Sequence, residues 1–313
     1  MKAVLTKEVG GPETLVVEQI DAVQPGKGEV LVDIAACAIN FPDTLMIRDM
    51  YQFKPERPYS PGGRVLAGIG SGGLREQVAI DAAKLFKVPE GVDLVEASAL
   101  LMTYGTMIHA LKDRGDIKPG DTVLVLGAAG GVGLASIELA KAYGARVVAA
   151  VSSDEKAKVA KDAGADETVV YPRAPFDKDQ SKALAGAFKE AVGANGADIV
   201  VDIVGGDYSE PALRSIAWEG RFLVIGFPAG IAKMPLNLTL LKSCDIRGVF
   251  WGAFAAREPQ RNAQNIAELF EMWKDGKIAP QVSETFNLDD AARAIEKLEN
   301  RQAIGKLVVV MDK

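Results

Sequence analysis

The sequence predicts an α/β fold in which a parallel sheet with helices on both faces is inserted into a discontinuous β unit. Three observations predict it. Short strands and turn residues fill residues 1–88, strands alternate with helical segments over residues 121–227, and an apolar strand closes the chain at 306–310. Strands that alternate with helices at this spacing form βαβ units, and the strands of such units pair in parallel.

The N-terminal end is expected to form five short strands, over residues 3–6, 15–20, 30–36, 75–80 and 85–88, with the turn sequences GGPE, QPGKG and GSGG between them. Clusters of Gly and Pro of this kind mark turns between strands. From about Val95, the apolar residues of ASALLMTYGTMIHALKD recur three and four positions apart. This spacing predicts a connecting helix.

The middle of the chain is expected to form the inserted sheet. Its strands are predicted over residues 121–127, 146–151, 168–171, 197–204 and 221–227, and its helices over 132–143, 154–163 and about 181–192. The tail adds a strand at 245–251, helices near 259–275 and 288–299, and the closing strand. Because the tail is too short for a third domain, we expect it to pack on the N-terminal strands. The predicted domains are therefore 1–98 plus 248–313 and 99–247.

Composition and charge exclude several classes of protein. A chain of 313 residues with 48% apolar and 25% charged residues is ordinary for a globular protein of about two domains. Lys and Arg number 36 against 42 Asp and Glu, so the net charge of −6 provides no general attraction for nucleic acid or for an anionic membrane surface. The N-terminus carries no signal-peptide pattern, and no window approaches about 18 uninterrupted apolar residues. We therefore expect a cytoplasmic protein that does not span a membrane.

No metal site is predicted. The two cysteines, Cys37 and Cys244, are far apart and form no C-x-x-C pair, so neither a disulfide framework nor a thiolate zinc site is indicated. The one histidine, His109, lies in an apolar helical segment, where packing is expected rather than a role as ligand or base.

The strongest local pattern is DTVLVLGAAGGVGLASIELAKAYGARVVAAV, residues 121–151. A strand, a glycine-rich turn, a helix and a second strand follow one another, which is the context that a dinucleotide-binding G-x-G-x-x-G turn requires. Ala128 replaces the first glycine, Gly130 lets a pyrophosphate approach the backbone, and Gly133 lets the helix pack closely on the strand. The alternative is a turn that binds nothing. The amides expected to bind the anion are those at the helix start: Ala129, Gly130, Gly131 and Val132.

The end of the second strand indicates which dinucleotide to expect. NAD enzymes usually carry an acid there, about twenty residues past the turn, which accepts hydrogen bonds from the ribose hydroxyls. Here the strand ends in Ser152 and Ser153, so no carboxylate repels a 2′-phosphate, and Lys156 and Ser152 could bind one. NADPH is therefore expected over NADH. Lys156 could equally be a solvated helix residue, and Ser153 a helix N-cap.

Several further segments extend the pattern over most of the chain: INFPDTLMIRDMYQ, PGG, GGLREQV, MTYGTMIHAL, VGGD, GRFLVIGF and IGKLVVV. With them, the sequence resembles the zinc-free quinone oxidoreductases of the medium-chain dehydrogenase/reductase superfamily, the group that includes zeta-crystallin. The resemblance implies a GroES-like β domain around a Rossmann domain, with the active site in the cleft between them. It also implies a homodimer that pairs sheet edges near Asp245 to Phe250.

The resemblance also assigns site residues. The family pattern implies that Asn40 and Tyr51 are catalytic and face the nicotinamide and the substrate. Beyond the glycine turn, it implies that the cofactor contacts Thr106, Ser152, Lys156, Tyr171, Gly226, Phe227, Phe250 and Trp251, of which Ser152, Lys156 and Tyr171 would hold the 2′-phosphate.

Each of these residues has a structural alternative. Asn40 could cap the helix that begins at Phe41 and Pro42, a role that is compatible with a place in the site. Tyr51 could be a packing residue, and Phe250 and Trp251 could belong to the core.

The sequence differs from the zinc-dependent alcohol dehydrogenases, which are similar in fold, and it departs from the zinc-free family pattern in one respect. It lacks the Cys and His ligands and the cysteine-rich lobe that zinc-dependent alcohol dehydrogenases need, so reduction of an electrophilic acceptor is favoured over alcohol oxidation. It also lacks a stretch with an E-x-A-G strand and a G-D-R-V turn, because Pro61, Gly62 and Gly63 run directly into Arg64 and Val65. The β domain is therefore predicted to be shortened after Gly63, which would leave strand edges to be covered.

The expected reaction is hydride transfer from NADPH to a quinone or an α,β-unsaturated carbonyl. The Tyr51 hydroxyl and the Asn40 amide would donate hydrogen bonds to the acceptor oxygen as it becomes negative. Two alternatives stay open. One is reduction of an enoyl thioester, as in related acyl-CoA reductases, and the other is an NADPH-binding protein with little turnover.

Overall fold

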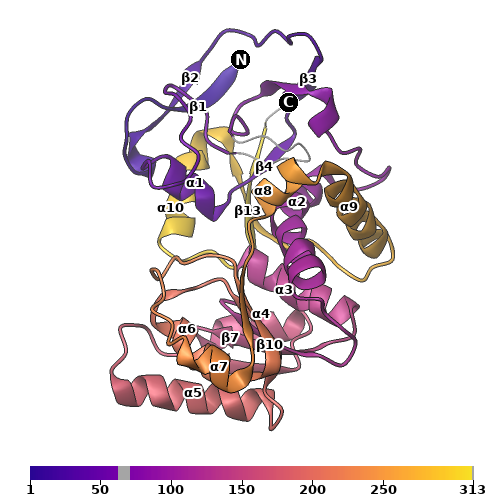
Figure 1. Ribbon diagram of the computed structural model, residues 1–313. Helices are drawn as coiled ribbons and strands as arrows, with labels where there is room; N and C mark the ends of the chain where they lie inside the picture. Colours follow the sequence, from indigo (N-terminus) through magenta and orange to yellow (C-terminus); the bar gives the residue numbers. More distant parts are fainter. Residues whose placement is uncertain (63–70, 312–313) are drawn as a thin grey trace. The chain divides into compact units, whose positions relative to one another are not determined.

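A computed structural model of the chain describes residues 1–62 and 71–311 (Figure 1). It divides into two compact units: Met1–Met102 with Pro280–Lys313 form the first, and Thr103–Ala279 form the second. Helix α2 (Leu94–Ile108) runs from one unit into the other along the chain. The bounds differ from the expected domain bounds, because residues 248–279 fall in the second unit. Helix α9 (Pro259–Lys274) within that stretch bonds to the short π-helix η3 (His109–Arg114), as Lys112 Nζ donates to Asn265 Oδ1 at 3.1 Å.

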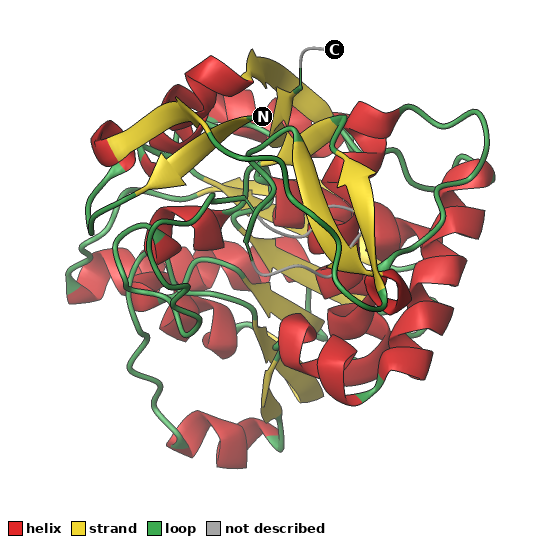
Figure 2. Ribbon diagram, turned by 90° about the horizontal axis from the view of Figure 1, so that it is seen from above, coloured by secondary structure: helices red, strands yellow, loops and turns green. Residues whose placement is uncertain are grey.

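The second unit is built on one parallel sheet. Its six strands lie in the order β11-β10-β9-β6-β7-β8, and every neighbouring pair is parallel, as predicted. Figure 2 shows these strands with helices on either side. The strands are β6 (Thr122–Leu126), β7 (Arg146–Val151), β8 (Glu167–Val170), β9 (Ala197–Asp202), β10 (Ile216–Val224) and β11 (Asp245–Gly248). The helices between them are α3 (Gly131–Ala142), α4 (Asp154–Asp162), α5 (Lys178–Val192), α6 (Ser209–Arg214) and α7 (Asn237–Lys242), and α8 (Trp251–Arg257) precedes α9.

The central strands are buried on both faces. Leu124, Leu126, Val148 and Val200 are fully buried, which explains why these strands are continuous apolar runs rather than alternating ones. A sheet of this kind positions its ligand-binding loops at the carboxyl ends of the strands.

The first unit holds smaller sheets around a separate core. Two antiparallel pairs join β1 (Lys2–Thr6) to β2 (Leu15–Gln19) and β3 (Glu29–Asp33) to β5 (Gln77–Asp81). A three-stranded sheet has the order β12 (Val282–Asn287), β13 (Lys306–Val310), β4 (Ala36–Ala38), and the helices are α1 (Phe41–Met46) and α10 (Ala291–Glu299). Val4, Ile39, Leu74, Ile295 and Val309 share one buried cluster. Residues 280–311 therefore pack with the N-terminal strands, as predicted for the end of the tail.

Several strands differ from expectation. Residues 85–88 form no strand, because the Asp81 carboxylate accepts a hydrogen bond from Ala83 N at 3.0 Å and turns the chain into a short 3-10 helix over Ala82–Lys84. The strand expected over 245–251 ends at Gly248, and Trp251 begins α8. Strand β12 was not expected, because VSETFN lacks a continuous apolar run. The predicted shortening after Gly63 falls on residues 63–70, which lie outside the described residues.

One helical stretch, Leu94–Arg114, is long and apolar enough to cross a membrane by length and composition. Within the structure, 78% of its most apolar window is buried, as is usual for a core helix. Its burial explains the apolar sequence without a membrane.

Candidate functional site

The glycine-rich turn joins β6 to α3 in the second unit. Gly127 has a φ of +73°, a left-handed conformation that favours glycine, and its N–H donates to Ala150 O at 3.0 Å. Ala128 is fully buried, and its N–H donates to the same carbonyl at 3.1 Å. Alanine is tolerated at the first position of the fingerprint because the left-handed residue of the turn is Gly127, one position earlier.

Gly133 determines how closely α3 approaches β6. A Cβ atom at this position would lie 2.4 Å from Gly127 O and 2.6 Å from backbone atoms of Ala128. Only glycine allows this packing, as predicted, because the crowded atoms belong to the main chain. At Gly130 the nearest atom to a Cβ would be Gly127 O at 3.7 Å, an ordinary contact. The turn is therefore open at Gly130 and closed at Gly133.

The first turn of α3 presents backbone N–H groups that have no acceptor within the helix. Gly130 is the N-cap and provides no capping side chain, and the N–H of Leu134 makes the first intrahelical bond, to Gly130 O at 2.8 Å. The N–H groups of Gly131 and Val132 precede that bond, and the first turn contains no acidic residue. Such a helix start attracts an anion through its amides and through the helix dipole.

Three residues that were predicted to bind the 2′-phosphate follow the carboxyl ends of β7 and β8. Ser152 follows β7 and is exposed, and Lys156 Nζ lies 3.4 Å from Ser152 Oγ. The Ser153 hydroxyl accepts a hydrogen bond from Lys156 N at 3.3 Å. Ser153 is therefore the N-cap of α4, which was the structural alternative for this residue. Tyr171 follows β8, and its N–H donates to Val151 O at 2.9 Å. No acidic side chain lies at the end of β7, where an NAD enzyme would carry one.

Tyr171 is also a core residue. It is buried, and its ring lies 4.7 Å from the ring of Tyr208. Contact between its side chain and a phosphate therefore stays a prediction.

Asp202, at the end of β9, was not singled out from the sequence. Its carboxylate accepts hydrogen bonds from Val204 N at 3.0 Å, Gly205 N at 2.8 Å and Ser209 Oγ at 2.5 Å. Burial raises the pKa of this carboxyl, and the hydrogen bonds oppose that shift. The residue thus fixes the loop after β9. The available signal was an acid that ends the apolar strand ADIVVD shortly before a glycine pair.

Gly226 and Phe227 follow β10, beside the loop that Asp202 fixes. Gly206 N donates to Gly230 O at 2.7 Å, and a Cβ at Gly205 would lie 2.5 Å from the same oxygen. The loops after β9 and β10 are therefore in close backbone contact. The side chain of Phe227 is 48% exposed, so its ring is available to a ligand.

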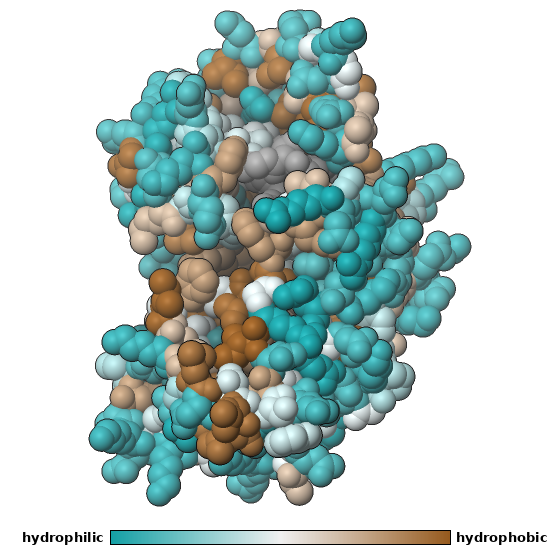
Figure 3. All heavy atoms as spheres, viewed as in Figure 1, coloured by the Kyte–Doolittle hydropathy of each residue, from teal (hydrophilic) through white to brown (hydrophobic). Residues whose placement is uncertain are grey.

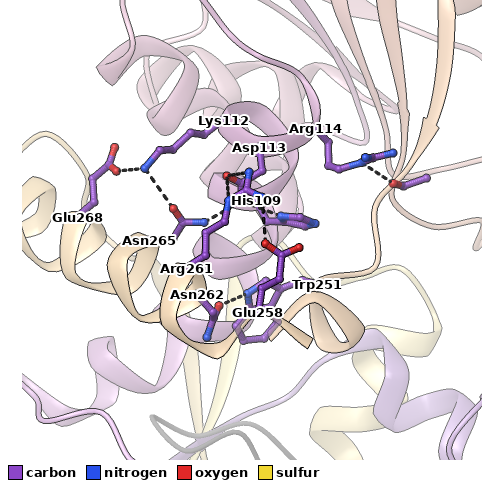
Figure 4. A network of polar contacts seen from close by, with 11 residues as sticks. His109, Lys112, Asp113, Arg114, Trp251, Glu258, Arg261, Asn262, Asn265 and Glu268 are labelled. Carbon is purple, nitrogen blue, oxygen red and sulfur yellow. Dashed lines mark hydrogen bonds and ion pairs between the residues drawn. The ribbon is translucent and has the colours of Figure 1, made fainter. Parts of the chain in front are cut away.

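Phe250 and Trp251, which were predicted together, have different environments. Phe250 is 54% exposed, whereas Trp251 is 5% exposed. Trp251 Nε1 donates to Asn262 Oδ1 at 2.9 Å (Figure 4), and a Cβ at Gly105 would lie 2.8 Å from the Trp251 ring. Trp251 therefore packs in the core between α2 and α9, which was the structural alternative. Thr106, next to Gly105 on α2, is 9% exposed.

His109 belongs to the polar network that Figure 4 shows. Its Nδ1 lies 2.8 Å from Asp113 Oδ2, and its ring stacks on Phe254 with centroids 3.9 Å apart. Arg261 and Asn265 from α9 also bond to Asp113, at 2.7 and 2.8 Å. Burial lowers the pKa of His109, and Asp113 opposes that shift. These contacts fasten η3 to α9 and support a packing role for His109.

In the first unit, Asn40 lies between β4 and α1 and is 7% exposed. It is the N-cap residue of α1, as expected, and its backbone N–H donates to Asp43 Oδ2 at 2.8 Å, the bond that the third helical residue makes in a capping box. Its side-chain Nδ2 donates to Ala38 O at 2.9 Å, and its Oδ1 accepts a hydrogen bond from Lys306 Nζ at 2.6 Å. Lys306 was missed from the sequence, because it precedes an apolar strand and resembles an ordinary strand-end lysine.

Tyr51 lies in the bend that follows α1 and is partly exposed. Within residues 1–62 and 71–311, its hydroxyl makes no hydrogen bond, so it is available as a donor. Arg57 Nη2 lies 2.9 Å from Asp49 Oδ1, and this ion pair closes the segment that carries Tyr51.

The predicted site residues thus fall into two sets. Asn40 and Tyr51 belong to the first unit, and the glycine turn, the residues after β7 to β10, Thr106, Phe250 and Trp251 belong to the second. Among the described residues, no group of three or more His, Cys, Asp or Glu side chains could hold a metal ion. Cys37 and Cys244 are both free thiols.

Comparison with known proteins gives consistent results. Residues 131–270 match a family model described as a zinc-binding dehydrogenase. The quinone oxidoreductase-like protein 2 of Bos taurus is 35% identical over 98% of this chain and 92% of its own length. Its alignment extends over 334 residues although this chain has 313, so the relative carries residues in the aligned region that this chain lacks.

Solved structures are similar over the whole chain. The quinone oxidoreductase of Thermus thermophilus, determined alone and with NADPH, is 31% identical with a TM-score of 0.84 and covers 99% of this chain and 100% of its own. The Escherichia coli quinone oxidoreductase complexed with NADPH is 26% identical with a TM-score of 0.88, over the same shares of the two chains.

Proposed function

Because the chain belongs to the quinone oxidoreductase family of the medium-chain dehydrogenase/reductase superfamily, we propose that it is an NADPH-dependent oxidoreductase whose acceptor is a quinone or an α,β-unsaturated carbonyl. The single observation that supports the cofactor assignment is the arrangement of residues at the carboxyl ends of β6 and β7 in the second unit. There, the glycine turn and the start of α3, which has no capping side chain, lie next to β7; Ser152 follows that strand, and Lys156 Nζ is 3.4 Å from the Ser152 hydroxyl. Solved relatives from T. thermophilus and E. coli bind NADPH.

The cofactor-binding residues have separate tasks. The amides of Gly131 and Val132 would bind the pyrophosphate. Ser152 and Lys156 would bind the 2′-phosphate with a hydroxyl and a positive charge. Bound NADPH supplies a hydride from nicotinamide C4.

The residues of the first unit would act on the acceptor. Hydride addition leaves negative charge on the acceptor oxygen, and the Tyr51 hydroxyl and the Asn40 amide would donate hydrogen bonds to it. Solvent would provide the proton that completes the reduction. We also propose that catalysis needs no metal and that the protein is cytoplasmic.

Replacement of Ser152 by aspartate tests the cofactor assignment. The new carboxylate would repel a 2′-phosphate and could accept hydrogen bonds from ribose hydroxyls. We expect the NADPH dissociation constant of Ser152→Asp to rise at least about tenfold, with that of NADH unchanged or lower. The exposed Lys158, on the same helix as Lys156, gives a matched control in Lys158→Ala, which should change neither constant. Equal affinities for NADPH in wild type and Ser152→Asp would contradict the assignment.

The acceptor class is tested by following NADPH absorbance with quinones, enones and enoyl thioesters at equal concentration. Turnover of quinones or enones supports the proposal. Turnover of enoyl thioesters alone would favour the acyl-CoA reductase alternative, and tight NADPH binding without consumption would favour the binding protein.

We further propose that the protein forms a homodimer through the second unit. Strand β11 is an edge strand of the six-stranded sheet, and unpaired strand edges readily pair with another chain. Helix α7 precedes it, and the apolar residues Leu236, Leu240 and Leu241 are between 63% and 79% exposed. Figure 3 shows apolar surface gathered where α7 lies. An edge strand beside exposed leucines is the kind of surface that a second copy would cover.

A further inference from the structure

A buried lysine in the first unit has no part in the chemistry proposed so far. Lys306 begins β13 and is 6% exposed. Its Nζ donates hydrogen bonds to Ile39 O and to Asn40 Oδ1, both at 2.6 Å. An ammonium group inside a protein is costly unless its donors are bonded. One of the two acceptors that bond to this ammonium belongs to Asn40, the residue that the proposed function places at the electron acceptor.

The contacts of Lys306 determine which way the Asn40 carboxamide faces. An amide has an oxygen that only accepts and a nitrogen that only donates, and the two ends have nearly the same shape. A lysine ammonium can only donate, so Oδ1 must face Lys306. On the other end, Nδ2 donates one N–H to Ala38 O at 2.9 Å. The amide is therefore held at both ends, and among residues 1–62 and 71–311 the second N–H of Nδ2 has no acceptor, so it can donate to a ligand.

The charged surroundings keep Lys306 protonated at neutral pH. Burial lowers the pKa of Lys306 to about 8, and the nearby Asp43 carboxylate opposes the shift. Asp43 is 1% exposed and accepts the Asn40 backbone N–H at 2.8 Å. Burial raises the pKa of Cys37, so this thiol stays neutral and Asp43 is the negative partner.

We propose that Lys306 is a positioning residue for the reaction, which holds the Asn40 carboxamide with its oxygen turned to the ammonium so that an amide N–H is ready for the acceptor oxygen. The ammonium group that donates to Oδ1 also draws electron density from the amide and strengthens its N–H as a donor. The inference rests on the proposed function, because it assumes that Asn40 donates to the acceptor.

The test compares Lys306→Met, Asn40→Ala and the double variant. Methionine is close in shape to the aliphatic part of the lysine side chain and removes the ammonium group with its N–H donors. We expect kcat of Lys306→Met to fall about tenfold with little change in the NADPH dissociation constant, because loss of one oxyanion donor outright costs roughly 10²–10³ in kcat. If Lys306 acts through Asn40, the double variant should be no slower than Asn40→Ala alone. Lys2, which pairs with Asp289 at the surface of the same unit, gives the control Lys2→Met, expected to keep wild-type kcat.

The outcomes separate the two claims. If the wild type reduces no acceptor, or Asn40→Ala keeps full kcat, the proposed role of Asn40 fails. If Asn40→Ala is slow and Lys306→Met is not, or if the two losses multiply in the double variant, the positioning role is wrong.

A pH profile needs no folded Lys306 variant. Wild-type kcat should decline as pH rises through about 8, where Lys306 loses its charge, and this inflection should disappear in Asn40→Ala. An inflection that is absent from the wild type, or that persists unchanged in Asn40→Ala, would overturn the proposal.

Discussion

Gly133 and Gly130 allow folding and cofactor binding to be disturbed separately within one turn. The alanine Cβ of Gly133→Ala would lie 2.4 Å from Gly127 O, where real Cβ contacts below 3.0 Å essentially never occur. Because the opposing atoms are main chain, α3 must move away from β6 by a sizeable part of an ångström. Overpacking of this kind costs about 1–3 kcal/mol, and we expect the upper end, ~3 kcal/mol, because no side chain can rotate aside.

Gly130→Ala should behave in the opposite way. Its Cβ would meet nothing closer than 3.7 Å, and Gly130 has a φ of −81° that alanine adopts freely. We therefore expect a change in unfolding free energy below about 0.5 kcal/mol. The methyl group would occupy the open side of the turn, so the NADPH dissociation constant should rise at least about tenfold.

Urea unfolding and NADPH titration of the two variants provide the assay, with Gly186→Ala as the control. Gly186 lies within α5, and a Cβ there would meet nothing within 4 Å. Alanine should stabilise that helix by about 0.5–1 kcal/mol without affecting NADPH binding. The account of the turn is refuted if Gly133→Ala is as stable as the wild type, or if Gly130→Ala binds NADPH with unchanged affinity.

Two further predictions concern the first unit and assembly. The pKa of Lys306 is about 8 in the folded chain against 10.5 for a free lysine, so its burial penalty is fully present below pH 8 and is relieved as pH rises toward 10.5. The unfolding free energy of the wild type relative to Lys306→Met should therefore rise by about 2 kcal/mol between about pH 7 and 9.5, measured by urea unfolding. A difference between the two proteins that does not change with pH would contradict the buried charge. The double variant Leu240→Asp/Leu241→Asp should be monomeric by light scattering, whereas the wild type should be dimeric. The control Val9→Asp, at an exposed position of the first unit, should stay dimeric. A monomeric wild type would contradict the proposed dimer.

The sequence was most informative where local pattern decides structure. The strand, glycine turn, helix and strand over 121–151 were predicted almost to the residue, because a continuous apolar run and a glycine turn leave few conformations. The strand predicted at 85–88 was wrong because Asp81 turns the chain into a short 3-10 helix first, and of these residues only Leu85 takes part in a β-bridge. β12 was missed because VSETFN contains only Val282 and Phe286 as apolar residues and therefore no continuous apolar run.

Tertiary environment was beyond the sequence. Phe250 and Trp251 are adjacent and chemically similar, and only the packing of α2 and α9 makes one exposed and the other buried. Lys306 and Asn40 are separated by 266 positions, so their contact depends on the path of the whole first unit. The same holds for Asp202, whose three hydrogen bonds need the finished loop after β9.

Calorimetric titration of NADPH into the wild-type protein, with NADH in parallel, tests the central claim most directly. The account predicts saturable heat with NADPH and an affinity at least about tenfold weaker for NADH, as expected for loss of a charge-assisted contact to a 2′-phosphate. No heat with NADPH, or equal affinity for the two dinucleotides, would contradict it.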